Sequence, residues 1–156
     1  MTESTGNTGA QGPGRAAIAV ATLIEQTARN IYDARAPSDV HPVQWAAMRF
    51  FARANRSARS VAGLARYLGV TLGPASRTVS ALRRNGYVDV RKDPRDKRVT
   101  IIDLTEQGRE LLHNDPIRRL ARALEDLPDD QFTQIGSGLA HIATTLDAAR
   151  AAGQND

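Results

Sequence analysis

The apolar residues of this 156-residue chain follow a helical spacing of three and four almost throughout, and they change to strict alternation in one place. Residues 87–91 and 98–102 each alternate apolar and polar side chains, and a charged loop containing Pro94 joins them. In the second segment Val99 and Ile101 are the expected inward-facing residues. This pattern predicts a single antiparallel hairpin with a polar tip inside an otherwise helical chain.

Breaks rich in Pro, Gly and polar residues divide the helical part into segments. Proline suits a first helical turn, Ser and Thr cap helix starts, and glycine ends helices in the left-handed conformation. These rules predict helices from Arg15 to about Arg35, from Pro42 to Ala54, from Val61 to Leu68, from Leu72 to Asn85, from the cap Thr105 onward with a bend at Pro116, and from Pro128 onward.

Basic residues concentrate in the middle of the chain, whose formal net charge is +4. Residues 49–98 hold 13 basic and three acidic side chains, a net charge of +10, and the rest of the chain carries −6. A basic middle between acidic ends indicates a module that binds a polyanion. The alternative is that these arginines form ordinary solvated helix faces, so the motifs have to decide.

Two short helices joined by the tight turn Gly69-Val70-Thr71 precede the hairpin, which is the order of a winged helix-turn-helix. The second helix then takes the recognition position, with a buried stripe formed by Leu72, Ala75, Val79 and Leu82. Its opposite face and entry end carry the candidate DNA-contacting residues Thr71, Gly73, Pro74, Ser76, Arg77, Ser80 and Arg84. An arginine placed here can bond bidentately to a guanine, and the alternative is a solvated surface side chain.

The hairpin loop, Asp93–Arg98, resembles the Asp-x-Arg-Asp-x-Arg wing of the MarR (multiple antibiotic resistance regulator) family of bacterial winged-helix transcription factors. The resemblance extends over roughly residues 15–150 through the stretches VQWAAMRFF, SVAGLARYLGV, ASRTVSALRRNGYV, IIDLTEQGRELL and LPDDQFTQIGSGLAHI. It implies a mainly α fold, a winged helix-turn-helix with flanking N- and C-terminal dimerisation helices. It also implies a homodimer on duplex DNA, with recognition helices in adjacent major grooves and wing tips in the minor groove.

The same resemblance assigns roles to the wing residues Asp93, Arg95, Asp96, Lys97 and Arg98. Arg95 takes the place of the wing-tip arginine that enters the minor groove, whose enhanced negative potential attracts such a side chain. Asp93, Asp96 and Arg98 take the places of residues that hold the wing by local ion pairs. The alternative for the two aspartates is a solvated turn.

The last helix carries Phe132, Ile135, Leu139, Ile142 and Leu146 at spacings of three and four, which is the seam of a helix packed along another helix. Packing within one chain is the alternative, but a few helices and one small hairpin offer little other core to cover this stripe. We therefore expect a dimer interface that includes Val20, Ile24, Ile31, Ile117, Leu120, Leu139, Ile142 and Leu146.

The domain organisation follows from these assignments. Residues 1–14 contain Gly, Thr, Ser, Asn, Gln and Pro but no aliphatic run, and such a segment cannot offset its ordering entropy. The expected division is a disordered tail at 1–14, a dimerisation helix at 15–37, a winged DNA-binding domain at 38–104 and dimerisation helices at 105–156.

Catalytic and metal-binding patterns are missing from the sequence. The chain has no cysteine, which excludes thiol nucleophiles, thiolate metal sites, disulfides and the thiol-based peroxide sensing of some MarR relatives. Its three histidines, His41, His113 and His141, lie far apart, and no phosphate-binding glycine loop or nucleophile elbow occurs. The sequence therefore predicts that the protein is not an enzyme and needs no metal or cofactor.

Members of the MarR family often bind small aromatic or phenolic effectors between the dimerisation helices and the winged domain. The resemblance implies such a pocket at His41 and Trp45, with Arg49 one turn on as the partner of an anionic group. The alternative for Trp45 is a core residue. The expected effector is thus a small aromatic or anionic molecule.

The prediction is a sequence-specific DNA-binding transcriptional regulator, a repressor as is more common in the family. It acts as a homodimer on a pseudo-palindromic operator and is relieved by a small ligand. The alternative is a winged-helix module that binds protein or RNA without sequence-specific DNA readout. Because no apolar run approaches the roughly 20 residues of a membrane span, we expect no membrane partner and a cytoplasmic location on the bacterial nucleoid.

Overall fold

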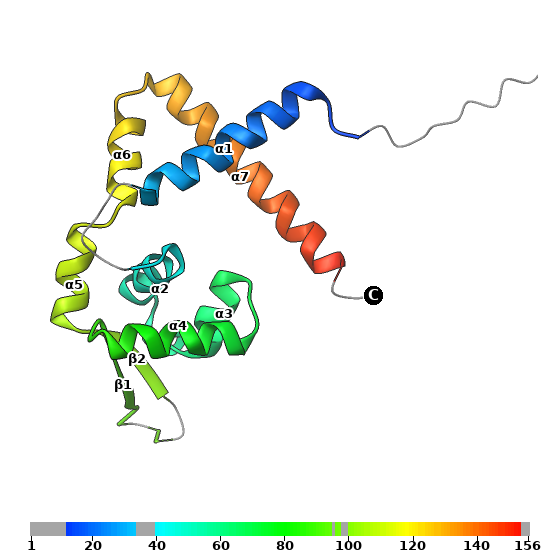
Figure 1. Cartoon of the computed structure of the whole chain (residues 1–156). Coiled ribbons are helices and arrows are strands. Elements are labelled where there is room, and N and C mark those ends of the chain that lie inside the picture. The colour runs from blue at the N-terminus through cyan, green and yellow to red at the C-terminus, as the bar shows by residue number, and fades with distance from the viewer. Residues whose placement is uncertain (1–11, 34–39, 95, 98–99, 154–156) are drawn as a thin grey trace, which may run out of the picture.

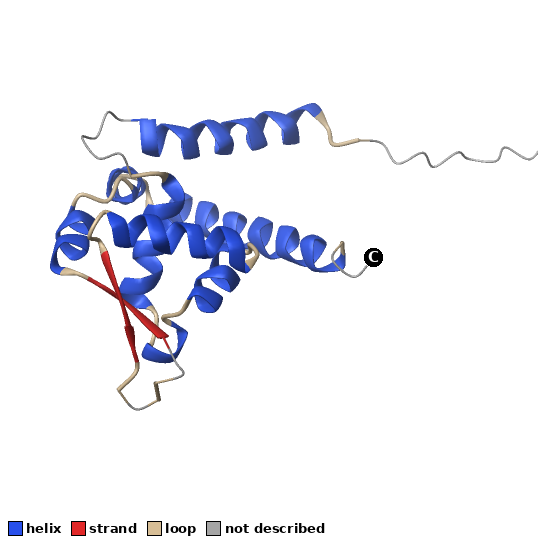
Figure 2. Ribbon diagram, turned by 60° about the horizontal axis from the view of Figure 1, so that its bottom comes forward, coloured by secondary structure: helices blue, strands red, loops and turns tan. Residues whose placement is uncertain are grey.

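The computed structural model describes residues 12–33, 40–94, 96–97 and 100–153 (Figure 1). Its elements are α1 (Arg15–Asp33), α2 (Pro42–Arg53), the 3-10 turn η1 (Arg56–Ala58), α3 (Val61–Leu68), α4 (Leu72–Arg84), β1 (Val88–Lys92), β2 (Thr100–Leu104), α5 (Glu106–His113), α6 (Ile117–Glu125) and α7 (Asp129–Ala152). The segments α2 to α5 gather around the hairpin, whereas α1 extends away from them and α7 approaches them with its C-terminal end (Figures 1 and 2). The expected fold class, mainly α with a winged helix-turn-helix between terminal helices, is confirmed.

The core lies between α2, α3, α4 and the hairpin, and we call α2–α5 with the hairpin the winged unit. Helical spacing on α2 and α4 turns one face of each inward. The buried apolar residues that form this core are Trp45, Ala47, Met48, Phe51, Leu64, Ala65, Ala75, Val79, Leu82, Val88, Ile102 and Leu104. Leu72 is a correction, because its side chain is 61% exposed. It lies in the first turn of α4 and lines an open groove facing α7 instead of the core.

Both ends of α3, the first helix of the helix-turn-helix, form as the sequence predicts. The Ser60 hydroxyl accepts a hydrogen bond from the Gly63 amide at 3.0 Å, which caps α3. Gly69 ends α3 with a φ of 64°, a left-handed conformation that glycine adopts without a steric cost. Thr71 precedes α4 in an extended conformation, but its side chain makes no capping hydrogen bond.

The exit from the hairpin is held by Thr105. Its hydroxyl donates to the Gly86 carbonyl at 2.6 Å and accepts from the Gly108 amide at 3.0 Å. A Cβ at Gly108 would overlap the Tyr87 carbonyl, so α5 can pack this closely only with glycine there. These contacts give a physical role to the Leu-Thr-x-x-Gly segment that begins at Leu104.

The hairpin is antiparallel as expected, but its second strand is shifted relative to the prediction. The register pairs Val88 with Leu104 and Val90 with Ile102, so Ile102 shares their face. Ile101 is also buried, but it points to the other face, and β2 begins at Thr100. Alternation alone cannot tell which of two adjacent isoleucines faces the core. Here a backbone hydrogen bond fixes the orientation of the strand, because the Ile102 amide donates to the Arg59 carbonyl at 2.9 Å. Val99 lies outside the described residues.

Pro116 separates two helices and does not bend one, which is a second correction. The helix capped by Thr105 ends at His113, and α6 begins at Ile117. A residue before proline avoids the helical region, which stops α5. The Asp115 carboxylate then accepts a hydrogen bond from the Ile117 amide at 3.0 Å and helps to start α6.

The ends of the chain are described only in part. Residues 12–14 are exposed and without regular structure, and 1–11 lie outside the described residues, so the predicted tail is untested over most of its length. α1 ends at Asp33, and the predicted break at 36–39 also falls outside the described part. Within the ranges that are described, no helix is both long and apolar enough to cross a membrane.

Candidate nucleic-acid interface

The recognition helix α4 presents the predicted DNA-contacting face to solvent. Thr71, Gly73, Ser76, Arg77, Ser80 and Arg84 are exposed, and Pro74 is half-buried. The opposite face carries the buried residues Ala75, Val79 and Leu82, which fix the helix on the core. An α-helix fits a major groove about 12 Å wide. The side chains available to such a groove are therefore small at the entry of α4 and basic farther along it.

Arg77 is the predicted base-reading residue on this face. A Cβ at Gly73, one turn earlier, would lie 3.6 Å from the Arg77 Nη1 atom, so the guanidinium leans toward the start of α4. Arg77 also borders a shallow cavity of about 530 Å³ together with His41 and Val43 from the start of α2. A side chain at position 73 would be in ordinary van der Waals contact with Arg77, so this arrangement does not depend on glycine.

The wing is attached to the rest of the domain by an ion pair that the sequence did not predict. Arg56 in η1 donates from Nη2 to Asp93 Oδ1 at 3.0 Å, across 37 residues of sequence. Asp93 was expected to hold the wing through local partners, and this partner comes from the connection between α2 and α3. Lys97 and Asp96 are exposed at the tip, whereas Arg95 and Arg98 lie outside the described residues, so their predicted roles remain untested.

Asp103 on β2 forms a second attachment between the hairpin and the same connection. Its carboxylate accepts from Arg59 Nη1 at 2.7 Å and from Arg91 Nη2 at 2.6 Å. Burial by itself raises the pKa of the Asp103 carboxyl, but the hydrogen bonds and charges of the two arginines outweigh it and hold that pKa below its ordinary value. Sequence could have suggested the Arg91–Asp103 pair as diagonal cross-strand neighbours, but it holds no signal for Arg59.

The three residues predicted to form an effector pocket are not brought together in one of the cavities found among the described residues. Trp45 is 2% exposed and lies in the core, as its alternative interpretation held. His41 is exposed at the start of α2, where its amide donates to the Gln44 side chain at 2.9 Å. Arg49 donates to Asp115 and Tyr32. The anionic partner of Arg49 in this structure is therefore a carboxylate of the same chain.

The predicted dimerisation residues divide into two groups by exposure. Val20, Ile24, Leu139, Ile142 and Leu146 are 39–65% exposed. Ile31, Ile117 and Leu120 are half-buried. α1 and α7 therefore leave apolar stripes uncovered by the rest of the described chain.

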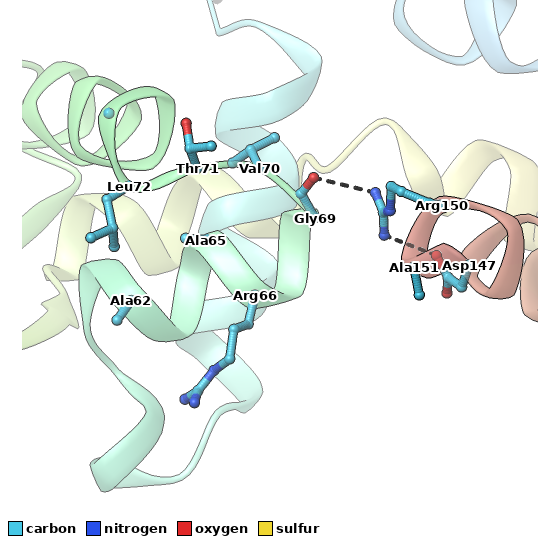
Figure 3. Close-up of a pocket in the computed structure, with 11 residues that line it drawn as sticks. Ala62, Ala65, Arg66, Gly69, Val70, Thr71, Leu72, Asp147, Arg150 and Ala151 are labelled. Carbon is cyan, nitrogen blue, oxygen red and sulfur yellow. Dashed lines mark hydrogen bonds and ion pairs between the residues drawn. The ribbon is translucent and has the colours of Figure 1, made fainter. Parts of the chain in front are cut away.

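The C-terminal end of α7 approaches the helix-turn-helix turn (Figure 3). Arg150 donates from Nη1 to the Gly69 carbonyl at 3.3 Å, and its Nη2 donates to Asp147 at 2.9 Å. An open groove between the turn and α7 is lined by Val70 and Leu72, among others. One terminal helix thus touches the element that positions the recognition helix.

A metal-binding constellation was not expected from the sequence. Over the residues that the structure describes, no group of three or more His, Cys, Asp or Glu side chains lies close enough to hold a metal ion.

Residues 38–99 match the sequence model of the MarR family, and no curated protein matches the chain. FabT from Streptococcus pneumoniae, solved in complex with DNA, shares the fold with a TM-score of 0.70 and 18% identity, covering 86% of this chain and 97% of that one. CouR from Rhodococcus jostii RHA1, solved with p-coumaroyl-CoA, has a TM-score of 0.67 and 22% identity, covering 83% and 92%.

A third similar structure is a MarR/EmrR family transcriptional regulator from Acinetobacter sp. ADP1, with a TM-score of 0.66 and 23% identity, covering 85% of this chain and 95% of that one. At these identities the structural matches establish the shared fold, and the family model adds the sequence of the winged segment. Regulators of this kind act by binding, in agreement with the prediction that the chain is not an enzyme. The winged segment, residues 38–99, thus has the sequence of the MarR family, and the chain as a whole has the fold of MarR-family DNA-binding transcriptional regulators.

Proposed function

We propose that this protein is a homodimeric repressor that reads a pseudo-palindromic operator through α4 and the wing. The observation that carries the proposal is the combination of two exposed surfaces on one chain. The exposed face of α4 is polar and basic, and α1 and α7 carry uncovered apolar stripes at coiled-coil-like spacing. The first surface suits DNA, and the second suits another copy of the same chain.

The symmetry of a dimer makes a geometric prediction about its DNA site. Two recognition helices related by a two-fold axis enter successive major grooves, so the half-sites should lie about 10–10.5 base pairs apart. Selection of duplex DNA by the purified protein, with the solution mass measured in parallel, tests this. Enrichment of one asymmetric half-site per dimer would contradict the geometry. Equal binding of all duplexes, with only a steep salt dependence, would contradict sequence-specific readout.

Arg77 is the proposed base-reading residue in this operator complex. Arg77→Ala should cost about 1–3 kcal/mol in operator binding and relax the sequence preference at one position of each half-site. Arg122→Ala, which removes an exposed arginine on α6, serves as the control and should leave the preference unchanged. If Arg77→Ala weakens all sequences equally, Arg77 contacts phosphate instead.

The wing residues are proposed to contact the flanks of the site. Lys97 is exposed at the tip. Lys97→Ala should reduce the slope of log affinity against log salt concentration by about one, without changing the preferred sequence. Arg95 is proposed as the minor-groove residue, so Arg95→Ala should weaken binding most at A·T-rich flanks. Equal losses on all flanks would argue against insertion into the groove.

A small aromatic or anionic effector is proposed to relieve repression. CouR, solved with p-coumaroyl-CoA, supports the idea only by analogy of fold. His41 is exposed beside the cavity that Arg77 borders, so a ligand there would lie next to the proposed DNA-reading residue. A panel of aromatic carboxylates added to the operator complex tests this, and a compound that releases DNA while binding the free protein would support it.

A further inference from the structure

Asp115 is a buried carboxylate at the joint between α5 and α6. Its side chain is 5% exposed, and among the described residues only Gln44 is another buried polar or charged side chain. A carboxylate removed from water is costly unless an opposite charge and hydrogen bonds compensate it. The partners of Asp115 therefore show which segments of the chain its buried carboxylate joins.

The compensating charge comes from Arg49 in the middle of α2. Its Nη1 atom donates to both carboxylate oxygens of Asp115, at 2.8 and 3.0 Å. The same carboxylate accepts from the Ile117 amide in the first turn of α6. One ion pair thus joins α2, in the core of the winged unit, to the start of α6.

Tyr32, at the C-terminal end of α1, completes the network. The Arg49 Nη2 atom donates to the Tyr32 hydroxyl at 3.0 Å, so the two ends of one guanidinium bind two different segments. Burial by itself lowers the pKa of Arg49, but its bonds to Tyr32 and Asp115 outweigh this and raise the pKa above its ordinary value. Arg49 therefore keeps its charge at any physiological pH.

The network lies where the terminal helices meet the winged unit. α5 packs against α2 and β2, whereas α6 packs against α1. The chain is not a continuous helix across this joint, because α5 ends at His113 and α6 begins at Ile117. A broken joint can bend unless side chains fix it, and Figure 2 shows α1 running apart from the winged unit along most of its length.

We propose that Arg49 is a positioning residue that fixes the angle between the winged unit and the helices α1 and α6. In the proposed dimer, this angle sets the distance and rotation between the two recognition helices. Arg49 then determines which half-site spacing the protein accepts, without touching DNA. This inference rests on the dimeric operator binding proposed above.

The first test measures affinity for three operators with the preferred half-site spacing, one base pair fewer and one base pair more. Each step moves a half-site by about 3.4 Å and rotates it by about 34–36°. The unaltered protein should prefer its own spacing by about tenfold. Arg49→Lys keeps the charge but loses the planar fork, and should lose most of this discrimination. Equal loss of affinity on all three operators, with discrimination intact, would overturn the proposal.

Two further variants separate positioning from folding. Tyr32→Phe removes only the hydroxyl and keeps the Arg49–Asp115 pair. If circular dichroism shows that Arg49→Lys is unfolded, Tyr32→Phe replaces it in the test. It should show a smaller loss of spacing discrimination in the same direction, and unchanged discrimination would count against the proposal. Arg29→Lys, in the exposed pair with Glu25 on α1, is the matched control and should bind as the unaltered protein does.

A second measurement needs no DNA and so stands apart from the proposed function. Because the chain has no cysteine, Gln26→Cys on α1 and Asp89→Cys on β1 place two spin labels without background. Labelled protein is diluted into an excess of unlabelled protein, so that each dimer carries at most one labelled protomer. Pulsed electron paramagnetic resonance then measures the distribution of distances between the two labels of that protomer. Arg49→Lys should broaden or shift that distribution, and Arg29→Lys should not. An unchanged distribution in Arg49→Lys would overturn the positioning role, even if the protein bound no palindrome at all.

Discussion

The winged unit and the terminal helices follow the same apolar spacing but end in opposite states. In the winged unit, Met48, Leu64 and Leu82 are fully buried. On the terminal helices, Leu23 is 62% and Leu146 is 65% exposed. The apolar residues of these helices nevertheless follow the same spacing of three and four as those of the winged unit. A hydrophobic stripe therefore shows which face of a helix seeks a partner and does not show whether the same chain supplies it. Substitutions in both kinds of stripe, and in the contacts that join the hairpin to its neighbours, test this contrast.

The double substitution Leu139→Glu with Ile142→Glu places charges in the uncovered stripe of α7. If another copy covers this stripe, the variant should become monomeric and lose about 10²–10⁴-fold in operator affinity, because two linked half-site contacts become one. The solution mass and a binding titration measure both effects. Ser137→Glu on the opposite face of α7 is the control and should remain dimeric. A folded monomer with full operator affinity would refute the assignment of the stripe.

Leu82→Ala tests the other side of the contrast, a stripe covered within one chain. Removing a fully buried leucine should lower the free energy of unfolding by about 2–5 kcal/mol, through lost burial and the cavity left behind. Chemical denaturation at several protein concentrations measures it. Leu72→Ala in the same helix is the control, because its side chain is 61% exposed and should cost less than about 0.5 kcal/mol. Similar losses at both positions would mean that Leu72 is covered in solution.

Thr105→Ala acts at the junction between the hairpin and α5. It removes the cap on Gly108 and the bond to Gly86, and should cost about 0.5–2 kcal/mol in unfolding free energy. Thr105→Ser keeps the hydroxyl and should restore most of the loss. If Ala and Ser cost the same in thermal unfolding, methyl packing and not the cap holds this junction.

Asp103→Asn should have the smallest effect and the clearest pH dependence. The pKa of Asp103 is lower in the folded protein than in the unfolded chain, so its contribution to stability is present above the unfolded pKa of about 3.9 and disappears as pH falls through the folded value. Asp103→Asn should therefore be less stable by about 0.2–1 kcal/mol near pH 6 and equal at strongly acidic pH. Thermal unfolding from strongly acidic pH up to pH 7 measures this, with Asp89→Asn on the same strand pair as control. A difference that persists in acid would exclude the ion pairs as its cause.

Much of the fold and of the recognition face could be predicted because the signals are local. Ser60 and Thr105 each cap a helix through an amide three residues later, and Gly69 acts through its own backbone angles. The exposed residues of α4 follow from the period of one helix. Leu72 and the inward-facing residue of β2, expected at Ile101 and found at Ile102, were assigned wrongly for a related reason. A period identifies a stripe, but the neighbouring segments decide where the stripe ends and which of two adjacent residues faces the core.

The effector assignment of Arg49 shows the limit of reasoning from position. Sequence placed Arg49 one turn after Trp45 on an apolar helix, where an anionic ligand was a reasonable partner. The structure gives it Asp115, which is 66 residues away, as the anionic partner. No spacing rule relates positions that far apart in the sequence, so this ion pair can be identified only from the folded structure.

The change from helical spacing to alternation and back was determined by the sequence alone, because each period reflects side-chain directions set by the local backbone. With the caps and the tight turn at Gly69, it was enough to predict a winged helix-turn-helix. The tertiary structure alone decided how this unit is attached. Arg56, Arg59 and Arg49 hold the wing and the terminal helices through carboxylates 37, 44 and 66 residues away. Ion pairs of this kind depend on which segments meet in space, and only the packed core brings those segments together.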